Sequence, residues 1–358
     1  MRIALLAPPL IPIPPPAYAG TERIIAVLAD ELDRRGHQVT LFAPGDSTSP
    51  GELVPVVPNS LWKEEAAADA PLATVLTAAM AWREQDRFDL IHSHLETGGF
   101  LLARHARVPV VSTLHGRLDS GAMPALLGEF RDVPLVAISD SQRRWFPDAN
   151  WVATIHHGLP LESMPFGANP GEYLLFLGRV VPEKGIGEAV QLARDVDLPL
   201  RIVAKVNLPE EEICFREVVE PALADDRVTF LGELAPSERD PLLAGALATL
   251  MLGAWPEPFG LVAIESLGTG TPVIARRAGA LPEIIEHGVD GFLVDDVAEA
   301  GLAVEMAREL DRARIRERAL ERFSSSRMVD QYEAVFQRLV EQASDARRRP
   351  AAVVSGRP

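Results

Sequence analysis

Two glutamates, Glu257 and Glu265, stand eight positions apart in the stretch EPFGLVAIESLGTGTPVIA. A helix is expected to begin near Phe259 or Gly260, after the apolar run 248–252, so Glu265 lies roughly 7 Å along it at about 1.5 Å per residue. A carboxylate accepts hydrogen bonds well from neighbouring hydroxyls. The spacing therefore allows Glu257 to contact one sugar while Glu265 binds the ribose diol of a nucleotide. The alternative is an amphipathic helix with two solvated acids.

The first amides of this helix form a second potential contact. In an open α/β sheet, a strand-to-helix junction lies at the carboxyl edge, where ligands bind. Amides in the first turn have no partner inside the helix and carry the positive end of its dipole, so they attract anions and hydroxyl oxygens. A glycine there lets a ligand approach the backbone closely. The residues predicted to bind a ligand in this way are Phe259, Gly260, Leu261 and Val262.

Two cations follow the first apolar run of the second half, in LGRVVPEKG (177–185). Arg179 and Lys184 would lie at the same carboxyl edge, where they could bind a diphosphate and stabilise the charge that grows on a departing phosphate. A solvated loop with two ordinary surface cations is the alternative. The glutamates described above favour the first interpretation.

The Pro-Phe-Gly after Glu257, the apolar run before it and GTPVIA after it resemble the E-x7-E motif of the retaining GT-B glycosyltransferases of family 4. The segment GALPEIIEHGVDGFLV (279–294) continues a resemblance that covers nearly the whole chain. It implies transfer of a sugar, with retention of configuration, from a nucleotide-diphosphate sugar to an acceptor. UDP-glucose is the first hypothesis for the donor, because UDP sugars are widely used in the family. The residues predicted to have catalytic roles are Arg179, Lys184, Glu257 and His115.

The resemblance also assigns residues outside these motifs. In the family, a glycine after the first strand approaches the donor diphosphate; this chain has Ala19-Gly20 where many members have two glycines, so only Gly20 is carried over. Loop residues beside that glycine meet the acceptor, which gives Thr21 an acceptor-binding role. The loop FLGELA (230–235) is expected to face the nucleotide base through the backbone around Leu234.

Three histidines end predicted strands of the first half: His92 and His94 in IHSHLETGG, and His115 in STLHG. His115 resembles the family histidine near the donor sugar. His94 is predicted to bind the acceptor, with a structural role as the equal alternative. A metal shared by His92 and His94 is not expected, on the argument that alternate strand residues point to opposite faces.

One D-x-D sequence, Asp195-Val196-Asp197, could suggest a metal that binds a nucleotide sugar. It falls between a predicted helix and the strand LRIVAKV (200–206), at the sheet edge opposite the expected ligand site. We therefore expect a helix-ending turn there. No metal and no other cofactor is predicted.

Apolar runs alternate with helix-length segments, as expected for parallel strands covered on both faces. They predict an α/β protein of the GT-B type, with two Rossmann-like, doubly wound domains that face a cleft. Residues 1–160 would bind the acceptor and residues 161–325 the nucleotide sugar, with a linker rich in Pro and Gly at 158–173. Residues 326–358 would form a helix that returns to the first domain, as the resemblance implies, and a disordered tail from 346. The runs are 2–7, 38–43, 53–57, 88–93, 108–114, 134–139 and 151–157, then 173–178, 200–206, 227–232, 248–252, 271–276 and 291–294.

Composition restricts the partners. A net charge of -16 over 358 residues argues against nucleic acid or an anionic membrane, since both need a basic surface. Cys214 is the only cysteine, which excludes an internal disulfide and favours a reducing compartment, so a cytoplasmic protein is expected. The longest uncharged stretch, 242–255, is shorter than the roughly 20 residues of a membrane span. A small soluble acceptor is expected, and membrane association is not, although SQRRWF (141–146) is basic and aromatic.

Three other functions fit the same fold. A nucleotide-sugar epimerase or hydrolase would act on the donor without an acceptor. A glycosyltransferase with a lipid acceptor would need a membrane-binding surface. A non-catalytic sugar-nucleotide-binding protein is disfavoured, because all four residues predicted to contact the donor, Arg179, Lys184, Glu257 and Glu265, are present.

Overall fold

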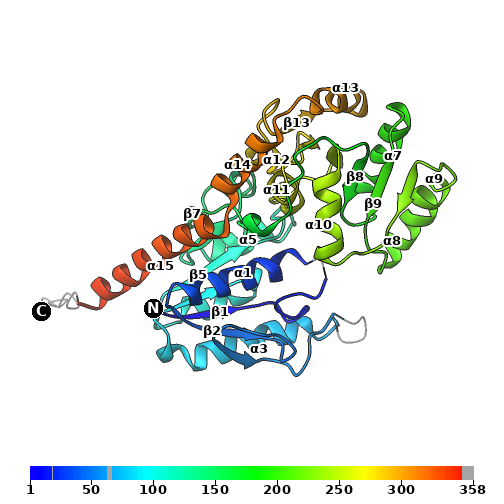
Figure 1. The fold of residues 1–358 in the computed structure, drawn as a ribbon. Coiled ribbons are helices and arrows are strands. Elements are labelled where there is room, and N and C mark those ends of the chain that lie inside the picture. Colours follow the sequence, from blue (N-terminus) through cyan, green and yellow to red (C-terminus); the bar gives the residue numbers. More distant parts are fainter. Residues whose placement is uncertain (18, 63–66, 349–358) are drawn as a thin grey trace, which may run out of the picture.

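The computed structural model describes residues 1–17, 19–62 and 67–348, which form two α/β units, each around a parallel sheet (Figure 1). The sheet of the first half has the strand order β3-β2-β1-β4-β5-β6-β7, and every neighbouring pair is parallel. Its strands are β1 (Arg2–Leu6), β2 (Gln38–Ala43), β3 (Glu52–Pro55), β4 (Leu90–Ser93), β5 (Val110–Leu114), β6 (Leu135–Ala137) and β7 (Trp151–Thr154).

The sheet of the second half has the order β10-β9-β8-β11-β12-β13, again parallel throughout. Its strands are β8 (Leu174–Leu177), β9 (Leu200–Val203), β10 (Val228–Phe230), β11 (Ala248–Met251), β12 (Val273–Arg276) and β13 (Gly291–Val294). Each predicted apolar run overlaps one of these strands, so the predicted α/β architecture is confirmed. The runs are apolar without alternation because helices cover both faces of each sheet.

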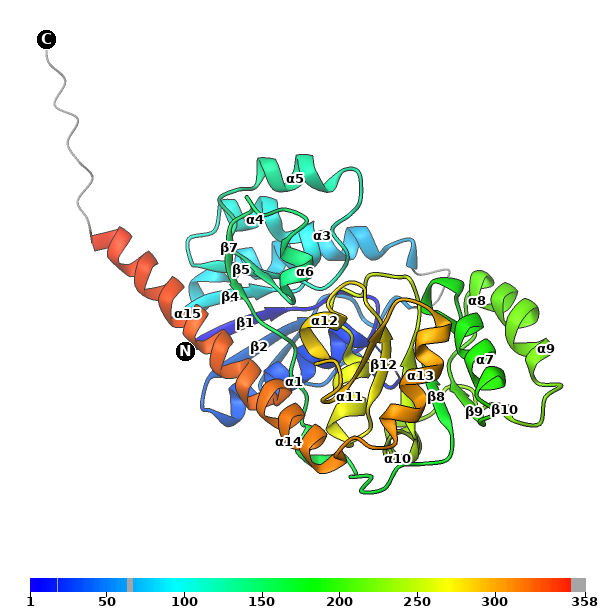
Figure 2. The same cartoon turned by 90° about the horizontal axis from the view of Figure 1, so that it is seen from above.

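Helices connect most successive strands and pack on the sheets (Figure 2). In the first half they are α1 (Gly20–Arg34), α3 (Ala70–Arg83), α4 (Phe100–Arg104), α5 (Met123–Glu129) and α6 (Asp140–Arg143), with 3-10 turns at Gln85–Arg87, Glu96–Gly99 and Leu161–Ser163. In the second half they are α7 (Ile186–Asp195), α8 (Pro209–Cys214), α9 (Glu220–Ala222), α10 (Pro236–Gly245), α11 (Leu261–Gly268), α12 (Leu281–Ile284), α13 (Val297–Ala307) and α14 (Arg312–Phe323), with a 3-10 turn at Pro182–Lys184 and a π-helical turn at Phe215–Val219. Within the described ranges, no helix is long and apolar enough to span a membrane.

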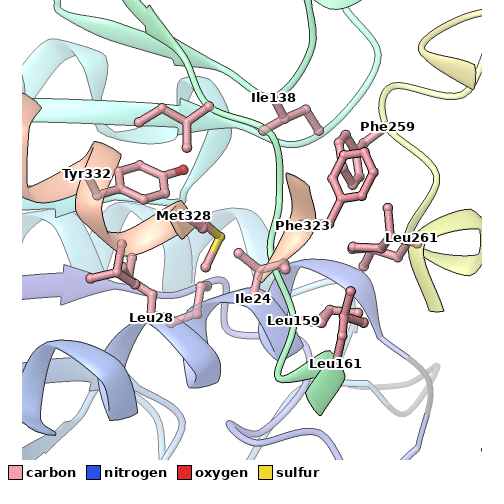
Figure 3. Packing of buried hydrophobic residues seen from close by; sticks show 14 of the residues in the cluster. Ile24, Leu28, Ile138, Leu159, Leu161, Phe259, Leu261, Phe323, Met328 and Tyr332 are labelled. Atoms are coloured by element: carbon pink, nitrogen blue, oxygen red, sulfur yellow. The ribbon is translucent and has the colours of Figure 1, made fainter. Parts of the chain in front are cut away.

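The last helix, α15 (Ser325–Arg348), runs back to the first half and packs on α1 (Figure 2). Residues at helical spacing, such as Met328, Tyr332 and Phe336, form its buried face, and Figure 3 shows Met328 and Tyr332 beside Leu28 of α1. The guanidinium group of Arg35, just after α1, donates to Asp330 at 2.6 Å. The predicted return of the C-terminal helix is therefore confirmed.

Two predictions about irregular segments need adjustment. Part of the linker 158–173 belongs to the core, since Leu159 and Leu161 are fully buried and the Leu159 amide donates to the Phe323 carbonyl at 3.0 Å. The disordered tail expected from 346 is helical through Arg348, where α15 ends. The rest of that tail, 349–358, lies outside the described residues.

Candidate active site

A cavity of about 260 Å³ lies between the two halves, at the carboxyl ends of the strands. Side chains and backbone from both halves line it, so segments more than 200 positions apart meet there. Ten of the predicted site residues contribute to its wall: Gly20, Thr21, His115, Arg179, Lys184, Glu257, Phe259, Gly260, Leu261 and Val262. Three others, His94, Leu234 and Glu265, lie behind or beside it.

Two helix N-termini meet at this cavity. Helix α11 begins at Leu261, after Gly260 with a φ of 113°, a conformation that a residue with a Cβ rarely adopts. Helix α1 begins at Gly20, and a Cβ built on this glycine would lie 3.3 Å from Leu261 Cδ1. The glycine therefore allows close approach of the two halves. The positive ends of both helix dipoles face the cavity, which favours an anionic ligand.

The two predicted phosphate-binding cations both have carboxylate partners. Lys184 donates to Glu257, and Arg179 donates to Glu210 at 2.8 Å and to Glu211 at 2.7 Å. Burial raises the pKa of Glu211, but the Asn207 amide and Arg179 outweigh this and hold the pKa below its ordinary value. The carboxylates thus orient the side chains of Arg179 and Lys184, which remain partly exposed.

Glu265 lies behind the cavity wall, with a side chain that is 0% exposed. Its Oε1 lies 2.8 Å from Arg239 Nη2 and also accepts a hydrogen bond from Arg23 of α1. Its Oε2 is buried, and no described residue bonds to it. One oxygen of the carboxylate therefore contacts both arginines, and the other has unused hydrogen-bonding capacity.

A smaller cavity beside the first contains Leu234, together with Glu233 and Arg239. The two cavities share Leu177, Gly178 and Arg179 at the end of β8. The segment predicted to face the base is thus next to the segment predicted to hold the diphosphate.

The histidines form a row instead of facing apart. The ring centroids of His92 and His94 are 4.1 Å apart, and His94 Nδ1 is 2.8 Å from His115 Nε2. The expectation that His92 and His94 point to opposite faces was wrong, because residues two apart on an extended chain share a face. Only His115 of the three lines the main cavity, while His94 is fully buried behind it.

Burial also decides the charge of these rings. Desolvation lowers the pKa of His92 and of His115 to about 3 and lowers the pKa of His94 as well. All three imidazoles are therefore neutral near pH 7. A metal centre is a separate question: within 1–17, 19–62 and 67–348, no group of three or more His, Cys, Asp or Glu side chains is arranged to hold an ion.

The D-x-D sequence forms the turn that was predicted for it. Helix α7 ends at Asp195, and Asp197 adopts a φ of 55° before β9 begins at Leu200. Asp197 accepts a hydrogen bond from Arg227. This turn is at the amino end of β9, opposite the cavity.

Among the residues of the cavity wall that were not predicted from the sequence are His157 and Trp255. His157 stacks on His115 with ring centroids 5.3 Å apart, and Trp255 lies between Arg117, at 4.0 Å from its ring centroid, and Lys184, at 5.7 Å. His157 ends the apolar run at 151–157, and Trp255 follows the run at 248–252, so both occupy the strand-end position that marks ligand-binding residues.

Known proteins resemble this chain along most of its length. The sequence model described as Glycosyltransferase Family 4 matches residues 18–162, and the one described as Glycosyl transferases group 1 matches residues 166–322. D-inositol 3-phosphate glycosyltransferase of Mycolicibacterium smegmatis is 27% identical, over 99% of this chain and 95% of that protein. N-acetyl-alpha-D-glucosaminyl L-malate synthase of Bacillus anthracis is 26% identical, over 90% and 94%.

The fold is shared with solved structures. HepE of Anabaena, in complex with UDP and glucose, aligns with a TM-score of 0.72 at 20% identity, over 94% of this chain and 99% of that one. With the matches to both halves, these findings show that the chain is a glycosyltransferase of family 4 with the GT-B fold.

Proposed function

We propose that this protein is a retaining glycosyltransferase that moves glucose from UDP-glucose to a small soluble acceptor without a metal ion. The observation that carries the proposal is the position of Lys184 and Glu257, which face the cavity beside the N-termini of α1 and α11. Cations and helix dipoles there favour a diphosphate. The single cysteine is the ground for proposing a cytoplasmic location.

We assign a role to each of the site residues. Arg179 and Lys184 bind the donor diphosphate and stabilise the charge on the leaving phosphate, and Glu257 contacts the transferred sugar. Glu265 accepts hydrogen bonds from the two ribose hydroxyls, and the backbone at Leu234 faces the base. Thr21 meets the acceptor from the first half, and the departing phosphate helps to take the acceptor proton. Domain boundaries at 160 and 325 belong to the same proposal.

The functions of the two relatives described above support a small acceptor. D-inositol 3-phosphate and L-malate, named for the two enzymes above, are both small and water-soluble, and HepE was solved with UDP and glucose. These names describe those proteins, and for this chain they guide the choice of substrates to test.

A donor screen tests the proposal. UDP-glucose is expected to raise the Tm more than GDP- or ADP-sugars do, because specific binding to the native state stabilises it. With D-inositol 3-phosphate, L-malate and related polyols as acceptors, the product is expected to keep the α-configuration by NMR. A larger shift with a GDP sugar would overturn the base assignment. Conversion of the donor at full rate without any acceptor would identify an epimerase or hydrolase.

Turnover is expected to persist in excess EDTA. The reason is that Arg179, Lys184 and the helix amides supply the positive charge that a divalent ion supplies in metal-dependent enzymes. The measurement is the initial rate before and after chelation, and then with added Mg²⁺ or Mn²⁺. Loss of activity in EDTA with recovery on metal addition would contradict the metal-independent assignment.

A further inference from the structure

The backbone around His115 is held by two side chains from other segments. Glu96 Oε1 accepts hydrogen bonds from the His115 amide at 2.9 Å and the Gly116 amide at 3.1 Å. Gln142 Nε2 donates to the Leu114 carbonyl at 2.9 Å and to the Gly116 carbonyl at 2.8 Å. Glu96 itself adopts a φ of 51°, a rare conformation for a residue with a side chain. The turn that carries His115 is therefore firmly placed.

Among the residues described, the ring of His115 has one hydrogen-bonding neighbour, His94. His94 Nδ1 and His115 Nε2 are 2.8 Å apart, so one of the two nitrogens must carry the proton between them. The other nitrogen of each ring, His94 Nε2 and His115 Nδ1, is buried and has no partner among the residues described. Both rings are neutral because burial lowers the pKa of each.

Two proton arrangements satisfy these contacts. If His115 donated through Nε2, the proton of His94 would sit on its Nε2, in a place where no ligand can reach it. A buried N–H without an acceptor is rarely found in proteins and is destabilising. If His94 donates through Nδ1, the unpaired proton sits instead on Nδ1 of His115. That nitrogen is covered in this structure, but the His115 ring lines the cavity and the His94 ring does not, so of the two rings only His115 borders the space that a ligand would enter.

We infer that His94 is a positioning residue that sets the tautomer of His115, so that His115 offers an Nδ1–H donor to the ligand in the cavity. The inference rests on the proposed function where it identifies that ligand as the transferred sugar. It replaces the acceptor-binding role predicted for His94 with a role exerted through His115. This role fits the position of His94, which has no access to the cavity and whose ring lies beside the His115 ring.

The tautomer can be measured directly. Long-range ¹H–¹⁵N spectra of the imidazoles distinguish Nδ1–H from Nε2–H, and the signal of His115 is assigned by its loss in His115→Gln. In the wild type we expect His115 to be protonated at Nδ1. Protonation at Nε2 in the wild type would overturn the inference, whatever the activity of the enzyme.

Two variants of equal size test the consequence. His94→Asp accepts a proton but does not donate, so it should move the His115 proton to Nε2 and lower turnover on the order of a hundredfold, with UDP affinity unchanged. His94→Asn can still donate, so it should keep the Nδ1 tautomer and most of the turnover. Equal loss in both variants would show that the His94 side chain only supports the fold.

The spectra test the inferred tautomer, and the rates test the proposed function, so each can be contradicted independently of the other. If the protein transfers no sugar from any nucleotide donor, the proposed function is wrong while the tautomer in the spectrum still decides the inference. If His94→Asp does not fold, the wild-type spectrum and His94→Asn decide it.

Discussion

Glu265→Gln should weaken binding of bare UDP by about 1.5–3 kcal/mol, the usual effect of losing hydrogen bonds to a charged group. Glu257→Gln should leave UDP affinity undiminished and nearly abolish turnover, because its contact is to the sugar and matters mainly in the transition state. The structure sharpens the difference. Glu265 is buried between Arg23 and Arg239, whereas Glu257 faces the cavity with Lys184. Calorimetry with UDP on both variants, alongside steady-state rates, makes the comparison.

Glutamine is preferred to alanine because its amide oxygen can still accept hydrogen bonds from Arg23 and Arg239, whereas alanine would remove the acceptor as well as the charge. Breaking a buried ion pair in that way costs about 3–5 kcal/mol of folding stability. Glu31→Gln is a matched control, since Glu31 also binds two arginines, Arg34 and Arg35, at a distance from the cavity. It should lower stability without affecting UDP binding. Equal weakening of UDP binding in the Glu257 and Glu265 variants would contradict the division of roles.

Arg179→Ala and Lys184→Ala should each lower turnover by about a hundredfold or more, on the order of 3 kcal/mol, as expected when a group that stabilises developing charge is lost. Both side chains are partly exposed at the cavity. The fold should tolerate the changes, since Glu211 keeps hydrogen bonds from the Asn207 and Leu208 amides after Arg179 is removed. Steady-state rates with saturating donor measure the effect, and circular dichroism checks the fold.

The control for these two variants is Arg216→Ala. Arg216 is exposed in the segment after α8, where its Nε donates to the Glu212 carbonyl at 3.3 Å. It lines neither cavity, so its removal should leave turnover unchanged. Near-normal rates in both the Arg179 and Lys184 variants would show that the diphosphate binds elsewhere.

The sequence by itself determined the elements and ten residues of the cavity wall. Apolar runs such as 38–43 and 248–252 favour strands covered on both faces, and both runs contain such strands. Residues that follow such runs, Arg179 and Glu257 among them, meet at one edge because parallel strands all end on the same side. Their position directly after a strand was therefore enough to predict that they lie at the carboxyl edge of the sheets.

Only the tertiary structure decided which side chains pair. Arg23 and Glu265 are 242 positions apart, and no local spacing relates them until α1 of one half faces α11 of the other. The same holds for the return of α15 onto Arg35. Contacts of this kind depend on how two separately folded units pack, which the periodicity of either unit does not encode.

The histidines show both what the sequence predicts and what only the tertiary structure decides. The sequence placed His94 and His115 at strand ends. It was wrong, however, to expect His92 and His94 on opposite faces, because residues two apart on a strand share a face. Neighbouring parallel strands bring residues 94 and 115 together, and the complete burial of His94 makes its ring neutral and gives it one hydrogen-bonding neighbour. A side chain's identity and strand position are written in the sequence, while its solvent exposure and its partners arise only when the two halves and the C-terminal helix enclose it.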